Sequence, residues 1–168
     1  YMLEEMLDFF AVLRSRYNNA IFLFITPDDA THIKSVALKK NIPAEKIVVK
    51  SASRKEVPLY LSLSNISIYF IRPTYSKRAS SPTKTAEVMA MGIPVITNAG
   101  IGDSDKMFSE SQTGLVVNDF TEKSYQQAIK QIDNLLSTDK NKIRHAAENY
   151  FSLERGVEKY EAVYKKLN

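Results

Sequence analysis

The 168-residue sequence contains no cysteine, which excludes a disulfide framework, a thiolate nucleophile, and cysteine-ligated zinc or iron–sulfur centres. Long apolar runs are also missing, because the longest, Ala20 to Ile25, is far below the roughly 18 residues that a membrane-spanning helix needs. No charged-then-apolar leader opens the chain. With 44% hydrophobic and 25% charged residues, we expect one globular, soluble domain in a reducing cytoplasm.

Several catalytic patterns are absent as well. The two histidines, His32 and His145, lie far apart in the sequence, and Asp28, Asp29 and His32 do not have a familiar metal-ligand spacing. We therefore expect no metal site and no resident cofactor. The sequence has neither a Gly-x-Ser-x-Gly elbow nor a Walker glycine loop, so acyl transfer and P-loop chemistry have no support.

Positive charge is concentrated in one segment of the chain. The net charge is +4, but the stretch from Lys39 to Lys84 holds ten basic residues and two acidic ones, so it carries +8 and the remainder −4. Such asymmetry is typical of a face that meets an anion, either a phosphate, a nucleic acid or an acidic headgroup. An equally supported alternative is that these basic residues are scattered over solvated loops and meet no particular ligand.

Short apolar runs alternate with helical patterns along the chain. After an opening amphipathic helix, we expect strands at 20–26, 46–50, 66–71, 94–98 and 114–117. Helices are expected between them, at 31–41, 57–64, 82–91, 104–111 and 121–137. Two further helices, at 139–150 and 153–167, should pack across the outside. Aromatic residues such as Phe22, Phe24, Tyr69 and Phe70 follow core periods.

This order predicts an α/β fold: a doubly wound, Rossmann-like parallel sheet of about five strands, with helices on both faces. Strands such as IFLFI and ISIYFI are apolar on both faces, as a helix-covered parallel sheet requires. Ligands of such sheets bind at the carboxyl ends of the strands. The loops after Thr26, Lys50, Ile71 and Asn98 are therefore the places to look for a site.

The segment SSPTKTAEVMAMGIPVI, residues 80–96, is the most informative. Ser81 is expected to cap a helix with Pro82 at its first position, and Gly92 to end it. The helix start would face the carboxyl edge of the sheet, where its free N–H groups and dipole favour phosphate. Lys84 and Glu87 share one face, and they suit phosphate charge and ribose hydroxyls. An ordinary capped helix with an exposed Lys–Glu pair remains the alternative.

Residues 80–96 resemble the donor-binding signature of family 4 (group 1) glycosyltransferases of the GT-B fold. The likeness extends to EVPLYLSLSNISIYFI (56–71) before the signature and to NAGIGDSDKMFSESQTGLVV (98–117) after it. The resemblance implies that residues 1–168 form one nucleotide-sugar-binding domain, the C-terminal half of a retaining enzyme. The N-terminal acceptor-binding domain and the first strand of this half would be absent. In the usual strand order the lost strand is central, so Ala20 to Thr26 would pair directly with Ile66 to Ile71, or another segment would fill the gap.

The resemblance also implies roles for individual residues. Glu87 would bind the ribose, and the loop after Lys50, including Ser51, the base. The diphosphate would be held without a metal by the hydroxyls and backbone of Ser80, Ser81 and Thr83. The expected catalytic groups, which stabilise the developing charge, are Lys84 and Arg72, and Lys77 and Arg78 are further candidates. The loop containing Gly100 and Gly102 would lie near the sugar or phosphate.

One departure from the family pattern keeps alternatives open. Many members carry two glutamates seven residues apart, and Ala79 stands where the first is expected. The domain could therefore be a non-catalytic, nucleotide-binding pseudo-transferase. A nucleic-acid binder using the +8 segment is a third reading, disfavoured because the basic loops lack interleaved aromatics. We expect a nucleotide sugar and the acceptor domain as partners, no nucleic acid, a role in cell-surface polysaccharide or glycolipid synthesis, and peripheral membrane association through the missing half.

Overall fold

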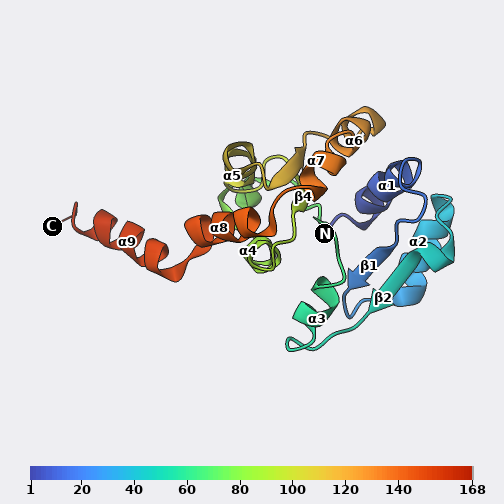
Figure 1. Ribbon diagram of the computed structural model, residues 1–168, viewed down its shortest axis with the longest axis horizontal. Coiled ribbons are helices and arrows are strands. Elements are labelled where there is room, and N and C mark those ends of the chain that lie inside the picture. The colour runs from blue at the N-terminus through green and yellow to red at the C-terminus, as the bar shows by residue number, and fades with distance from the viewer. Residues whose placement is uncertain (168) are drawn as a thin grey trace.

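The computed structural model describes residues 1–167 and consists of five short strands that alternate with helices (Figure 1). The five strands lie where the sequence predicts them: β1 (Phe22–Ile25), β2 (Ile47–Lys50), β3 (Ser67–Ile68), β4 (Val95–Asn98) and β5 (Gly114–Val117). The α-helices that surround them are α1 (Leu3–Arg14), α2 (Ala30–Lys39), α3 (Val57–Leu61), α4 (Thr83–Ala90), α5 (Ser104–Ser111), α6 (Glu122–Ile129), α7 (Ile132–Leu136), α8 (Lys140–Phe151) and α9 (Leu153–Tyr164). The predicted α/β class is confirmed.

The strands are all parallel but form two sheets. One sheet pairs β1 with β2, and the other has the order β3-β4-β5. β4 is the central strand of the larger sheet, and all four of its residues are buried. Helices α4 and α5 connect the strands of the larger sheet and pack on it together with α6, while α2 connects β1 to β2 in the smaller sheet.

Helix α1 holds the two sheets together. Its residues Met6 and Phe9 belong to the core of the larger sheet, whereas Leu7 and Phe10 belong to a second core around α2 and β2. The Phe9 ring meets Phe70 edge-on with centroids 6.0 Å apart, and the Phe10 ring lies 5.2 Å from that of Phe22 on β1. The prediction that Tyr69 and Phe70 are core residues is confirmed, since they are 3% and 0% exposed.

Of the two alternatives expected for the gap, the direct pairing of Ala20–Thr26 with Ile66–Ile71 is wrong. No ladder joins β1 to β3 in the described residues, so the sheet is interrupted between them. Met2 lies at this interruption, where its backbone N–H donates to the Phe70 carbonyl at 3.0 Å. Phe22 and Phe24 remain only half-buried, because no strand covers the free edge of β1.

The C-terminal part departs from the prediction in two ways. The helix expected over 121–137 is divided into α6 and α7, because the chain tightens at Gln131, whose N–H bonds to the Ala128 carbonyl three residues back. Helix α8 packs on α4 and α5 as predicted, but α9 projects away from the molecule and has no buried residue (Figure 1). The reason is Ser152, whose extended backbone redirects the chain.

Candidate functional site

The ends of β3 and β4 are joined by one buried side chain. Asn98, the last residue of β4, is 2% exposed. Its Oδ1 accepts the Ile71 N–H at 2.8 Å, and its Nδ2 donates to the Ile71 carbonyl at 3.0 Å. The side chain therefore replaces a ladder pair where the two strands separate, and it fixes the loop that carries Arg72 and Pro73. Sequence reasoning missed this role, although a polar residue ending an apolar strand was a signal.

Helix α4 begins one residue later than predicted. Ser81 does not cap it: Pro82 takes the N-cap position with an extended backbone, and no side chain caps the helix. The reason is that the proline ring fixes φ at −68° while ψ is 113°, which is the geometry of a cap residue and not of the first helical turn. The first-turn N–H groups of Thr83 and Lys84 thus lack a side-chain acceptor, which suits an anion. The C-terminal prediction is confirmed, since Gly92 follows the helix with a φ of +72°.

Two predicted donor-binding segments meet through Gly102. Its N–H donates to the Lys77 carbonyl at 3.0 Å, and a Cβ on Gly102 would lie 2.1 Å from the Ser80 carbonyl oxygen. Only glycine permits this approach, and its φ of +51° also lies in the left-handed region. The glycine loop after β4 is therefore held against the segment that enters α4.

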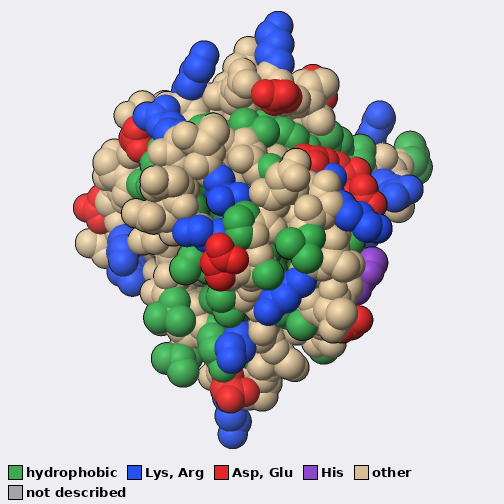
Figure 2. Space-filling view, turned by 90° about the vertical axis from the view of Figure 1, so that its right-hand side faces the viewer, with side chains coloured by type: hydrophobic (Ala, Val, Ile, Leu, Met, Phe, Trp, Pro, Cys, Tyr) green, Lys and Arg blue, Asp and Glu red, His purple; other side chains and the backbone are tan. Residues whose placement is uncertain are grey.

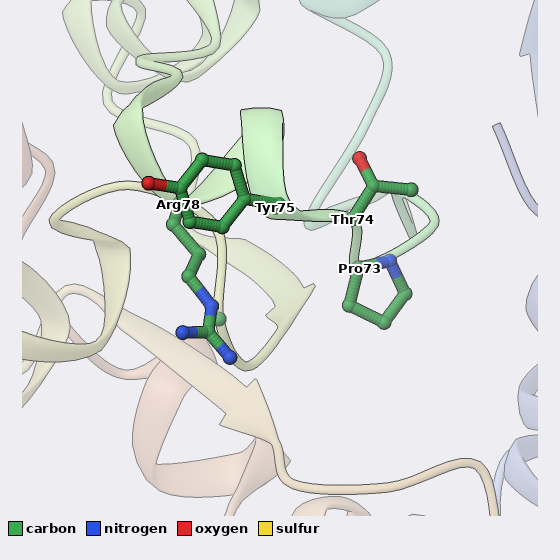
Figure 3. A pocket seen from close by; sticks show the side chains of 5 residues that line it. Pro73, Thr74, Tyr75 and Arg78 are labelled. Atoms are coloured by element: carbon green, nitrogen blue, oxygen red, sulfur yellow. The ribbon is translucent and has the colours of Figure 1, made fainter.

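A hollow of about 230 Å³ opens beside these segments. It is lined by Pro73, Thr74, Tyr75, Arg78 and Gly100, of which only Arg78 is charged. Figure 3 shows the Arg78 and Tyr75 side chains on one side of the hollow, with Pro73 and Thr74 on the other. The short 3-10 helix Tyr75–Ala79 that carries Arg78 was not predicted, because its five residues have no apolar period.

Lys84 lies between two aromatic rings. Its ammonium nitrogen is 3.7 Å from the centroid of the Tyr1 ring and 5.5 Å from that of Tyr69. Tyr69 is buried and its hydroxyl bonds to the Thr85 hydroxyl, while burial raises its pKa. These two rings hold the lysine near the start of α4. Lys84 forms no ion pair with Glu87 in the described residues.

The predicted residues fall into two groups. The entry to α4 and the glycine loop are brought together, namely Ser80, Ser81, Thr83, Lys84, Gly100 and Gly102. Arg72 is exposed beside them, and Glu87 is exposed on the next turn of α4. Lys50 and Ser51 are exposed at the end of β2, in the other sheet, and no hydrogen bond or ion pair of the described residues connects them to α4.

Most of the charge on the basic segment is not neutralised. Of its ten basic residues only Lys40 forms an ion pair within residues 1–167, with Asp8 at 2.6 Å and Glu4 at 4.0 Å. Figure 2 shows lysine and arginine side chains spread over one face with acidic side chains among them, not gathered into one patch. No three histidine, aspartate or glutamate side chains of the described chain gather as metal ligands, and none of its helices is long and apolar enough to cross a bilayer.

The fold resembles that of a known enzyme. A mutant form of the O-GlcNAc transferase from Thermobaculum terrenum aligns with a TM-score of 0.67 and 17% sequence identity. The alignment covers 96% of this chain but 33% of that one, so the chain spans about a third of the length of its structural neighbour. At this identity the likeness concerns the fold alone. Together with the parallel strands and flanking helices, it shows that this α/β domain has the fold of the matching part of that enzyme.

The sequence comparison specifies the family. Residues 2–150 match the family model described as glycosyl transferases group 1. This match covers most of the chain, which therefore belongs to the group 1 glycosyl transferases. No curated protein matches the sequence.

Proposed function

We propose that this chain is the donor-binding half of a retaining, metal-independent glycosyltransferase that uses a nucleotide-diphosphate sugar. The observation that carries the proposal is the uncapped start of α4 at the carboxyl edge of the larger sheet, with Lys84 beside it. The free N–H groups and the positive end of the helix dipole lie at this end of α4, and Lys84 belongs to its first turn. This combination favours a diphosphate over a neutral ligand.

The proposed chemistry is electrostatic. During transfer the bond between the anomeric carbon and the diphosphate oxygen breaks, and the electron pair stays on the leaving diphosphate. The α4 amides, Lys84 and Arg72 would stabilise this developing negative charge, while the acceptor oxygen bonds to the anomeric carbon and passes its proton to the leaving diphosphate. Arg78, which lines the adjacent hollow, is a third cation within the same loop system.

The remaining residues would hold the rest of the donor. The exposed hydroxyls of Ser81 and Thr83, with half-buried Ser80, flank the diphosphate position, and Gly100 and Gly102 let the backbone approach it. The exposed carboxylate of Glu87 would accept ribose hydroxyls. Lys50 and Ser51 would meet the base from the other sheet, so donor binding would span the interruption between the two sheets.

The acceptor would come from polysaccharide or glycolipid synthesis. Its site, together with any attachment to the inner membrane face, would belong to a separate acceptor-binding half.

A pseudo-transferase is the second candidate. It is favoured by Ala79, which is exposed at the end of the 3-10 helix beside the hollow and offers no carboxylate to a sugar. This alternative predicts nucleotide binding without sugar transfer.

A thermal-shift panel of UDP, GDP, ADP and their common sugar conjugates tests the proposal. A ligand present at about 100 times its Kd should add about 2.7 kcal/mol to the free energy of unfolding. Lys84→Ala should raise the Kd about tenfold or more, because a charged phosphate contact contributes about 1.5–3 kcal/mol. Glu87→Ala should weaken the binding of nucleotides but not that of inorganic pyrophosphate.

Lys165→Ala is the matched control, because this lysine directly follows α9, its side chain is 78% exposed, and it is far along the chain from α4. If Lys84→Ala and Lys165→Ala weaken nucleotide binding equally, the basic residues contribute to binding only through the net charge of the chain. Binding of single-stranded DNA that falls steeply with salt, without any nucleotide response, would support the nucleic-acid reading instead.

A further inference from the structure

The hollow beside the glycine loop contains one cation and no carboxylate. Arg78 is the charged residue among those that line it. This arginine forms no ion pair within residues 1–167. The carboxylate of Asp105 accepts the Gly100 N–H at 3.2 Å, but Asp105 does not line the hollow. The Arg78 guanidinium is therefore available to an anion that enters the hollow.

The turn that carries Arg78 is fixed by backbone hydrogen bonds. The Lys77 N–H donates to the Thr74 carbonyl at 2.9 Å. The Lys77 carbonyl in turn accepts the N–H groups of Ser80, at 3.2 Å, and Gly102, at 3.0 Å. These bonds hold the turn against the glycine loop. An arginine on an ordered turn loses less conformational entropy when it binds a ligand, so its position suits a specific contact.

The hollow shares the glycine loop with the proposed diphosphate position. Gly100 lines the hollow, and Gly102 lies against Ser80 at the entry to α4. In a nucleotide-diphosphate sugar, the base and the sugar are at opposite ends of the diphosphate, and the base is proposed to lie at the other sheet. The volume of about 230 Å³ equals that of about eight water molecules, which is room for one monosaccharide but not for a nucleotide. Given the proposed function, on which this step rests, the hollow is the place for the sugar.

We propose that the hollow selects donors whose sugar carries a carboxylate, as a uronic acid does, and that Arg78 is the residue that determines this specificity. A guanidinium group can donate two parallel hydrogen bonds to a carboxylate. The hydroxyl groups of a neutral sugar form weaker bonds with the same group. Ala79, the next residue, is compatible with an acidic sugar because it places no negative charge beside it, whereas a glutamate there would repel the carboxylate.

Tyr75 provides a second contact, which does not depend on charge. Its side chain is 90% exposed and lies on the same side of the hollow as Arg78 (Figure 3). The face of an aromatic ring carries partial negative charge and is apolar, so it packs well against the C–H groups of a sugar ring. Tyr75 therefore contributes equally to the binding of neutral and acidic sugars, whereas Arg78 distinguishes between them.

NMR titration of the isotope-labelled chain with glucose 1-phosphate and glucuronate 1-phosphate tests the proposal. The two ligands differ in one group, a hydroxymethyl or a carboxylate, and neither has a base, so the comparison does not depend on which nucleotide the protein uses. Glucuronate 1-phosphate should have a Kd lower by about fivefold or more. Arg78→Gln should remove this preference, and Arg78→Lys should keep part of it, because lysine retains the charge without the paired donors. Tyr75→Ser should raise both Kd values by the same factor.

Arg155→Gln is the matched control, because it removes the same charge at an exposed position on α9 and should leave the preference unchanged. Equal Kd values for the two sugar phosphates, or a preference that persists in Arg78→Gln, would overturn the proposal. So would an equal loss of preference in Arg78→Gln and Arg155→Gln, since the net charge alone would then explain it.

UDP, GDP and ADP are titrated in parallel to separate this proposal from the proposed function. If one of these nucleotides binds while the two sugar phosphates bind equally, the specificity proposal fails and the proposed function stands. If neither the nucleotides nor the sugar phosphates bind at millimolar concentrations, both fail.

Discussion

Replacing Gly102 with alanine should separate the glycine loop from the entry to α4. The new Cβ would lie 2.1 Å from the Ser80 carbonyl oxygen, about 1 Å inside the closest contact that real Cβ atoms make. The left-handed backbone adds about 1–2 kcal/mol of strain, and a forced contact about 1–3 kcal/mol. We therefore expect Gly102→Ala to lower the free energy of unfolding by about 2–5 kcal/mol.

Gly100→Ala provides the matched control for this prediction. Gly100 also has a positive φ, +78°, but a Cβ there would meet nothing within 4 Å. It should cost only the backbone strain, about 1–2 kcal/mol. Urea unfolding of both variants measures the difference, and NMR shifts of the Ser80 and Ser81 amides report local displacement. Equal destabilisation by the two substitutions, with unmoved Ser80 and Ser81 signals, would refute the close approach of the two segments.

Three further predictions concern other parts of the chain. Asn98→Ala should lower the free energy of unfolding in urea by about 1–3 kcal/mol, because both backbone groups of Ile71 lose their partner. A loss below about 0.5 kcal/mol would contradict this role of Asn98. A chain ended after Ser152 should keep its unfolding free energy within about 0.5 kcal/mol, since α9 buries no residue; a larger loss by calorimetry would show that α9 packs on the domain. The Tyr17 hydroxyl donates to Asp133 and lowers the pKa of this carboxyl. The ionised Asp133 therefore contributes to stability above about pH 4, and this contribution is lost as the pH falls through the lowered pKa. In a plot of urea midpoint against pH, Asp133→Asn should make the fall at acid pH less steep, and an unchanged fall would contradict this.

The strands and most helices could be predicted because their signals are local. Short β-branched and aromatic runs gave all five strands, and the Gly92 position that ends α4 follows from its freedom to adopt a positive φ. The start of α4 was placed one residue early, because proline is compatible with both the cap and the first helical position. Such a choice depends on ψ, which local sequence does not determine.

Features that depend on long-range contacts were missed. The Asn98 side chain bonds to Ile71, which lies 27 positions earlier in the sequence. The rings beside Lys84 come from Tyr1 and Tyr69, and no local periodicity of the sequence connects these residues with Lys84. The apolar stripe of α9 predicted packing, but amphipathicity identifies a face that needs a partner without saying which partner is present. The division into two separate sheets bridged by α1 was not predicted, because the sequence led us to expect that β1 and β3 pair directly or that another segment fills the gap between them.

We propose that the entry to α4 and the glycine loop after β4 together bind a nucleotide diphosphate. The most direct measurement is an NMR titration of the isotope-labelled chain with UDP, GDP and ADP, following the backbone amide signals. Saturable shifts are expected for one of these nucleotides, centred on Thr83, Lys84, Gly100 and Gly102. Saturable shifts centred on other elements, or no shift at these four amides at millimolar concentrations of all three nucleotides, would contradict it.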